Sequence, residues 1–150
     1  MRALSLVTLG CLAILSGLAG CAAHKASLKQ SVQVPGKRPA VRSLIVSPWA
    51  GELGALVGEE LRARGFEVLD PGLRRQADAQ LLLEVHPGPD DKPQSVTARL
   101  LAVPGQELIV ELTWTNAAAG LPGSAADAAV RKDQAAAAKE IAAALAARLR

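Results

Sequence analysis

The chain is poor in aromatic side chains, with two Trp, one Phe and no Tyr among its 150 residues. Proteins that bind single-stranded nucleic acid combine a basic groove with stacking aromatic rings. No basic stretch of this sequence is interleaved with aromatic residues in that way. We therefore expect no nucleic-acid partner, and the same scarcity argues against a site that stacks rings on glycans.

Cysteine and histidine are equally rare, with two of each. Both cysteines, Cys11 and Cys21, lie near the N-terminus, so the rest of the chain has no disulfide and no thiol, and its stability must come from a packed core. A catalytic nucleophile needs an adjacent base held by a third group, and the combination of His86 with Asp90 or Asp91 is the one route to such a set.

His86 precedes Pro87 at the end of a predicted strand, a position that favours a structural or solvent-facing histidine over a catalytic one. The same three side chains fall short of a metal site, which needs three or four well-placed ligands. No glycine-rich loop followed by Lys-Ser or Lys-Thr precedes a helix, so no phosphate loop is present. We expect a protein with no enzymatic activity, no metal and no cofactor.

The chain also lacks a hydrophobic run long enough for a transmembrane helix. The longest, Leu4 to Ala19, is interrupted by Ser, Thr and Gly and is shorter than the roughly 20 predominantly apolar residues that a bilayer requires. A basic start, an apolar stretch and small residues before a cleavage point are typical of a secretory signal peptide. We predict that residues 1–20 are removed.

The end of this stretch, Leu18-Ala19-Gly20-Cys21, resembles the bacterial lipobox. That resemblance implies a diacylglycerol on the sulfur of Cys21 and an acylated amino group. Because each buried methylene adds about 0.8 kcal/mol, three acyl chains (palmitate among them) would hold the protein durably. Ala22, rather than Asp, follows, which is similar to the pattern sent to the outer membrane. The expected location is the periplasmic face of the outer membrane in a Gram-negative-type envelope.

Residues 21–40 are predicted to form a flexible tether, because they consist mostly of Ala, Lys, Ser, Gln, Pro and Gly without apolar periodicity. Its residues from Ala22 to Ala40 would reach at most roughly 60 Å. Residues 21–50 carry basic side chains and no acid, whereas residues 51–150 are net acidic. The basic tether either contacts anionic head groups or serves as a solvated linker.

Residues 41–150 alternate between strand and helix patterns, which predicts one α/β domain. The expected strands are 41–46, 66–69, 79–86, 96–103 and 107–115, the last two joined as a hairpin by Pro104-Gly105-Gln106. Three leucines in the third of these strands suggest that it is covered on both faces. The predicted fold is a single layered domain with a mixed, mostly antiparallel sheet of about five strands.

Two helices are expected to pack on this sheet. The first is amphipathic, with Leu53, Val57 and Leu61 on one face and Gly65 at its C-cap. A helical turn follows at Asp70-Pro71. Ser124 and Asp127 resemble a capping box, and a long Ala-rich helix with a stripe of Ile141, Leu145 and Leu149 is predicted to follow to the C-terminus.

Gly65-Phe66-Glu67-Val68 after the first helix, and Ala77-Asp78-Ala79 before the central strand, carry a resemblance to a known domain group. They resemble the compact domain shared by the curli secretion-channel lipoprotein, the amino-terminal domain of TolB and the lipoproteins that activate penicillin-binding proteins. The resemblance implies an α/β domain that contacts envelope proteins. The chain lacks the long insertions that a curli-type pore would need, so pore formation is not expected.

Two functions from different classes remain. The first is a protein-interaction module, an assembly factor, activator or accessory subunit of an envelope complex, in which Trp49 is a candidate interface residue because tryptophan is enriched at binding hot spots. The second is a lipoprotein that binds a small ligand or glycan in a pocket near Trp49 and the loop 87–93. Trp49 could instead cap the core between strand and helix, since tryptophan is usually largely buried.

Overall fold

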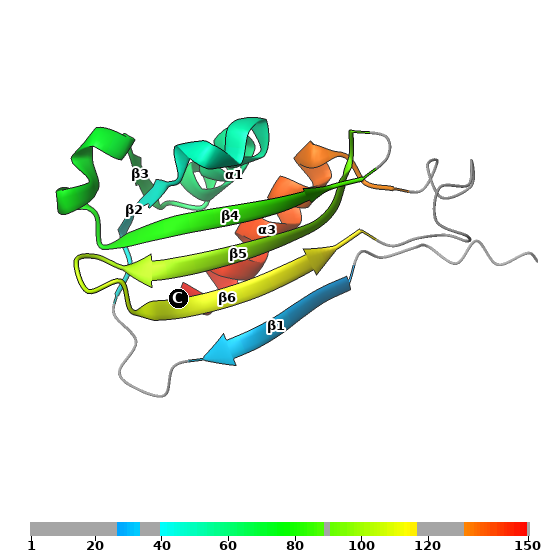
Figure 1. Cartoon of the computed structure of the whole chain (residues 1–150). Coiled ribbons are helices and arrows are strands. Elements are labelled where there is room, and N and C mark those ends of the chain that lie inside the picture. The colour runs from blue at the N-terminus through cyan, green and yellow to red at the C-terminus, as the bar shows by residue number, and fades with distance from the viewer. Residues whose placement is uncertain (1–26, 34–39, 89–90, 117–130, 150) are drawn as a thin grey trace, which may run out of the picture.

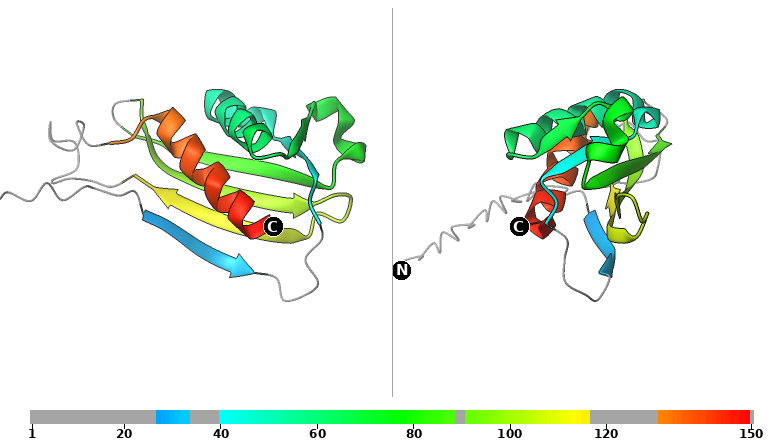
Figure 2. Two further views of the ribbon diagram at one scale, coloured as in Figure 1. Left: turned by 180° about the vertical axis from the view of Figure 1, so that it is seen from behind. Right: turned by 90° about the vertical axis from the view of Figure 1, so that its left-hand side faces the viewer.

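The structure is a computed structural model that describes residues 27–33, 40–88, 91–116 and 131–149. These residues form a six-stranded sheet with the strand order β1-β6-β5-β4-β2-β3. Both long helices lie on the same face of the sheet (Figures 1 and 2). The elements in chain order are β1 (Ser27–Gln33), β2 (Ser43–Val46), the 3-10 helix η1 (Pro48–Ala50), α1 (Gly51–Ala63), β3 (Glu67–Leu69), the 3-10 helix η2 (Pro71–Gln76), β4 (Ala79–Pro87), β5 (Pro93–Ala102), β6 (Leu108–Thr115) and α3 (Gln134–Leu149).

The sheet is mixed. β4, β5, β6 and β1 pair with one another antiparallel, whereas β2 pairs parallel to both β4 and β3. The predicted fold class, a single α/β domain with a mixed, mostly antiparallel sheet and two packed helices, is therefore confirmed, as is the hairpin between β5 and β6.

The sixth strand, β1, lies inside the segment that the sequence predicts to be a tether. It pairs with β6 from Ser27↔Thr115 to Gln33↔Val110, with an irregularity between Gln30 and Val32. The prediction of a flexible chain therefore differs from the structure over these seven residues. The segment SLKQSVQ lacks the apolar alternation by which strands are recognised, and an edge strand can be held by main-chain pairing to one neighbour.

The core lies between the sheet and the two helices. In β6 the predicted alternation is confirmed, because Val110, Leu112 and Trp114 are buried and the residues between them are less so. α3 contributes Ile141 and Leu145 together with buried alanines, as its stripe predicts. Trp114 keeps its polar atom satisfied, since its Nε1 donates to Glu140 Oε2 at 2.7 Å.

Among the described residues, helices lie on one face of β4 only, which differs from the prediction that it is covered on both. Leu81 is fully buried and Leu83 is 8% exposed, but Leu82 is only half-buried. Neighbouring residues of a strand point to opposite faces of the sheet, and both long helices lie on one of those faces. A leucine triplet is thus compatible with one covered face.

α1 ends as the sequence predicts. Gly65 has a positive φ of 89°, its N–H donates to the carbonyl of Arg62 at 2.9 Å, and the N–H of Phe66 donates to the carbonyl of Leu61 at 3.1 Å. This pair of bonds is a Schellman motif, and buried Phe66 and Leu61 belong to the same core cluster. The motif turns the chain directly into β3.

α3 begins at Gln134, where Asp133 Oδ1 accepts a hydrogen bond from the N–H of Ala136 at 2.8 Å. The entry to this helix is tied to the sheet by buried Asn116, whose Nδ2 donates to the carbonyls of Pro93 and Lys132 and whose Oδ1 accepts from the N–H of Lys132. The predicted capping box at Ser124 and Asp127 lies outside the described residues.

Candidate functional site

The most exposed large apolar side chain among the described residues is Trp49, at 93% exposure. It belongs to η1, the short turn between β2 and α1, in which Ala50 is buried and Trp49 is not. The alternative that Trp49 caps the core is therefore wrong. A single 3-10 turn cannot point all three of its residues inward, and here the small alanine takes the inward position.

A second exposed apolar residue stands on the corresponding turn after β3. Leu73 of η2 is 40% exposed. Because β2 and β3 are parallel neighbours, their carboxyl ends lie at the same end of the sheet, and the turns η1 and η2 follow these ends. In open α/β sheets, binding sites form beside the carboxyl ends of the strands. We name the exposed residues Trp49 and Leu73, together with the groove described next, the carboxyl-edge surface.

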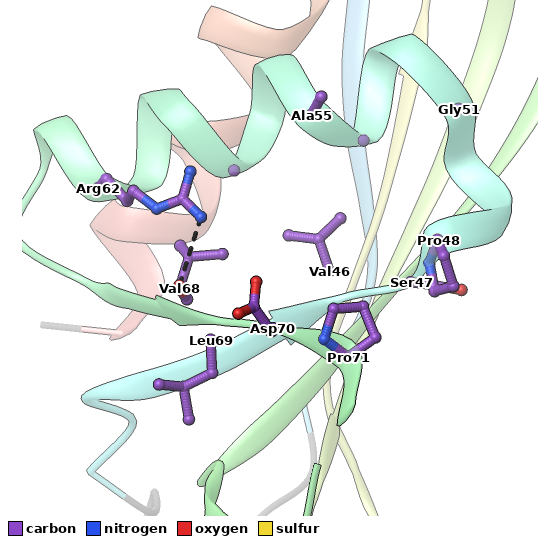
Figure 3. A pocket seen from close by; sticks show the side chains of 12 residues that line it. Val46, Ser47, Pro48, Gly51, Ala55, Arg62, Val68, Leu69, Asp70 and Pro71 are labelled. Atoms are coloured by element: carbon purple, nitrogen blue, oxygen red, sulfur yellow. Dashed lines mark hydrogen bonds between the residues drawn. The ribbon is translucent and has the colours of Figure 1, made fainter. Parts of the chain in front are cut away.

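A groove runs between α1 and the chain that leaves β2 and β3 (Figure 3). It has a volume of about 230 Å³ and is open to solvent. One face of α1, made of Gly51, Gly54, Ala55, Gly58 and Arg62, forms one wall. Its remaining lining comes from Val46, Ser47, Pro48, Val68, Leu69, Asp70 and Pro71.

The glycines of α1 differ in how closely neighbouring atoms approach them. A Cβ atom on Gly54 would lie 2.8 Å from the Cβ of Ala50, which is too close. A Cβ atom on Gly58 would lie 3.7 Å from methyl carbons of Val46 and Val68, an ordinary contact distance. Only Gly54 is therefore required for packing, while the absence of a side chain at Gly58 leaves the groove wider than the fold demands.

Two charged groups line the groove. The Arg62 Nη2 donates to the main-chain carbonyl of Val68 at 3.4 Å, a long bond in an exposed position. The carboxylate of Asp70 points into the groove in Figure 3. Asp70 is the N-cap of η2, yet its side chain makes no capping hydrogen bond, so the carboxylate is left available to a ligand.

The other sequence motif, Ala77-Asp78-Ala79, has a structural role at the opposite end of β2. Asp78 Oδ2 accepts hydrogen bonds from the backbone N–H groups of Ser43 and Arg42, both at 2.9 Å. These two backbone bonds, with Ser43 Oγ and the charge of Arg42, lower the pKa of Asp78 below its usual value. The motif joins the start of β2 to the start of β4 and does not line the groove.

Of the candidate catalytic set, the structure describes His86 and Asp91 and does not place them around one hollow. His86 is more than half exposed, and its Nε2 lies 3.7 Å from Glu84 Oε1. Asp91 lines a separate hollow that includes Lys92 and Asp133 but not His86, and Asp90 lies outside the described residues. Within the described ranges, no group of three His, Cys, Asp or Glu side chains could hold a metal ion.

The predicted ligand pocket is only partly present. The groove lies beside η1, but it includes none of the described residues of the loop 87–93. Leu18, Ala19, Gly20 and Cys21 lie outside the described residues. Of the helices in the described part of the chain, none is both long enough and apolar enough to span a membrane.

Sequence reasoning found Trp49 but missed the groove. Gly51, Gly54 and Gly58 all line the groove. Their spacing of three and four residues places them on one helix face, and that spacing was the available signal. Nothing in the local pattern showed that this face would look onto Asp70 from another element.

No family model matches the sequence, and no curated protein matches it. Among solved structures, the chain is similar to two dodecamers of PelC from Paraburkholderia phytofirmans. A single-residue variant in space group C2 gives a TM-score of 0.48 at 19% identity, over 82% of this chain and 97% of that chain. The form in space group P6 gives 0.45 at 20% identity, over 75% and 96%. The likeness is limited to the arrangement of helices and strands.

Proposed function

We propose that this protein is an outer-membrane-anchored periplasmic lipoprotein that acts as a protein-interaction module, as an assembly factor, activator or accessory subunit of an envelope complex. It binds its partner through the carboxyl-edge surface and performs no catalysis of its own. The observation that carries the proposal is the 93% exposure of Trp49. A tryptophan left in water has a large apolar area to bury, and tryptophan is prominent among interface hot spots.

The N-terminal sequence supports the anchoring part of the proposal. Leu18-Ala19-Gly20-Cys21 supplies a lipid attachment site, and the resemblance of the domain to envelope lipoproteins implies the same compartment. A domain tied to a membrane meets its partners at high effective concentration, so a small contact surface is sufficient for function.

The alternative, a lipoprotein that binds a small ligand or glycan, is less well supported by the groove. Small-ligand pockets commonly hold about 300–1,000 Å³ and bury most of the ligand. This groove holds about 230 Å³ and is open along its side. Its shape suits a segment of another protein better than an enclosed small molecule.

Affinity purification from solubilised envelopes tests the proposal. The lipidated wild-type protein is expected to retain a protein partner in a stoichiometric amount, and Trp49→Asp is expected to lose that partner. Gln94→Asp, an exposed change on β5, serves as the control and should retain it. Because Trp114 is fully buried, unchanged emission from Trp114 in Trp49→Asp would show that the domain is folded.

Two results would contradict the proposal. One is retention of the same partner by Trp49→Asp at the wild-type level. The other is a purified protein that carries a small molecule and no protein, which would favour the ligand-binding alternative.

A further inference from the structure

We propose that the partner supplies an extended peptide segment, which lies in the groove, pairs with the free edge of β3 through its main chain and places an acidic group against Arg62. This inference rests on the proposed function and names the kind of partner that the carboxyl-edge surface recognises. It is drawn from the main-chain geometry of β3 and from the charges beside it.

β3 is an edge strand of the described sheet, in which it pairs with β2 and with no other described strand. The N–H of Glu67 donates to the carbonyl of Arg42 at 2.9 Å, so the main-chain groups of Glu67 point toward β2. Successive residues of a strand direct these groups to opposite sides. The N–H and C=O of Val68 therefore point outward, where an added strand would pair with them.

Arg62 occupies this edge in the unbound protein. Its Nη2 is the donor to the Val68 carbonyl, at 3.4 Å, as Figure 3 shows. This bond is long for a hydrogen bond, so an incoming peptide N–H, which can approach to about 2.9 Å, would replace it favourably. Charged side chains at sheet edges often block unwanted pairing, and here the block is weak enough to be displaced.

Displacement leaves the guanidinium of Arg62 facing the peptide. Arg62 is exposed, and no ion pair with an acid is found for it among the described residues. Charge complementarity therefore selects a carboxylate on the peptide, either a side chain or a terminal group, which can accept two parallel bonds from arginine. Asp70 lines the same groove and favours a basic side chain elsewhere on the segment.

The shape of the groove fits an extended chain. Its helical wall runs from Gly51 to Arg62, which corresponds to about 16 Å at 1.5 Å per residue. That length matches about five residues of a strand. Gly54 and Gly58 leave the wall flat, so peptide side chains on that side meet little obstruction, while Val46 and Val68 supply apolar contact.

A displayed library of random decapeptides, panned against the purified full-length protein, provides the probe. We expect enriched sequences that share an acidic residue within a segment free of proline. A selected peptide is then resynthesised with one N-methylated amide at a time, and its affinity is measured by fluorescence polarisation. Because Val68 is the residue of β3 whose main-chain groups point outward, N-methylation should weaken binding by about tenfold or more at the peptide amide that pairs with the Val68 carbonyl and little at the amides on either side of it.

Protein variants locate the contact. Arg62→Gln should weaken the acidic peptide by about tenfold and should leave a peptide whose acidic residue is replaced by Gln nearly unaffected. Gly58→Leu should block the groove and abolish binding. Arg75→Gln removes an exposed arginine of η2 that does not line the groove, so it is the charge-matched control and should bind as the wild type does.

The inference is overturned if panning enriches no sequence, if N-methylation weakens binding equally at every position or at none, or if Arg62→Gln and Arg75→Gln behave alike. These failures are distinct from failure of the proposed function. If Trp49→Asp loses the partner but no single peptide amide proves to be required, the interaction module stands and only the peptide-pairing mode is removed.

Discussion

Asp78 and Ser43 are hydrogen-bonded to each other in both directions. Asp78 Oδ2 accepts from the N–H and the Oγ of Ser43 at 2.9 and 3.0 Å. The N–H of Asp78 in turn donates to the Oγ of Ser43 and to its carbonyl, both at 3.1 Å. This reciprocal pair holds the first residue of β2 beside the residue that precedes β4, and so fixes the register between the parallel strands β2 and β4.

Removing this carboxylate should destabilise the domain. Asp78→Ala leaves the N–H groups of Arg42 and Ser43 without their acceptor, and bonds to charged groups contribute about 1.5–3 kcal/mol. Asp78 is itself exposed, so we expect the free energy of unfolding to fall by about 1–2 kcal/mol. Urea titration measures it. Asp70→Ala, which removes an exposed carboxylate without a capping bond, is the control and should change stability by less than about 0.5 kcal/mol.

Acid should destabilise the domain through two carboxylates. Backbone hydrogen bonds lower the pKa of Asp78. Burial raises the pKa of Glu140, but bonds from Lys132 and Trp114 outweigh it, so this pKa also lies below its usual value of 4.5. A lowered pKa contributes stability that is present above the usual value and is lost as the pH falls through the folded value.

We therefore expect the free energy of unfolding to decline below about pH 4.5, the ordinary range of carboxyl pKa values. Denaturant titrations between pH 7 and pH 3 measure the decline. Glu140→Gln should be less stable than the wild type at pH 7 and should lose less on acidification. Equal slopes for the two proteins would show that Glu140 does not contribute.

Two glycines of the same helix should respond oppositely to alanine. Gly58→Ala introduces a Cβ at ordinary contact distance and should stabilise the domain by about 0.5–1 kcal/mol, because alanine favours the helix. Gly54→Ala would bring its Cβ within 2.8 Å of another side chain, and overpacking typically costs about 1–3 kcal/mol. Thermal melts of both variants test this, and a stabilised Gly54→Ala would show that α1 can move away from η1.

Leucines on the two faces of β4 should contribute differently to the stability of the domain. Leu81→Ala removes a fully buried side chain and should cost about 2–5 kcal/mol. Leu82→Ala, on the half-buried face, should cost at least about 1 kcal/mol less. Equal losses in urea melts would mean that the open face of the sheet is covered in solution.

Lipid attachment at Cys21 is expected to be the sole anchor. Cys21→Ala should abolish incorporation of labelled palmitate and release the protein from membranes, with the domain still folded, because no described core residue involves Cys21. Cys11→Ala, within the predicted signal peptide, is the matched control and should be labelled and membrane-bound. Continued labelling of Cys21→Ala would contradict the lipobox assignment.

The sequence predicted the elements whose signals are local. The apolar alternation of β6, the helical spacing in α1 and the glycine at position 65 each depend on a few neighbouring residues. β1 was missed because its partner is more than 70 residues away and its own sequence is polar. Pairing of that kind is decided by tertiary contacts rather than by propensity.

The candidate site also has one part that the sequence predicted and one part that it did not. Trp49 was identified from residue type alone, but its exposure was decided by the direction of one 3-10 turn. The groove could not be predicted, because it forms where the glycine face of α1 meets Val68 and Asp70 from a separate element. Covering of β4 was overestimated because leucine content does not reveal how many faces of a strand are packed.

The pairing of β1 with β6 also determines how the sheet would stand on a membrane. With Cys21 lipidated, only the few residues before Ser27 separate the lipid from β1, and they span at most about 20 Å. β1 and β3 are opposite margins of the sheet, about 24 Å apart across five strand spacings. The lipid would thus keep the β1 margin within about 20 Å of the head groups, whereas the groove belongs to the opposite margin of the sheet.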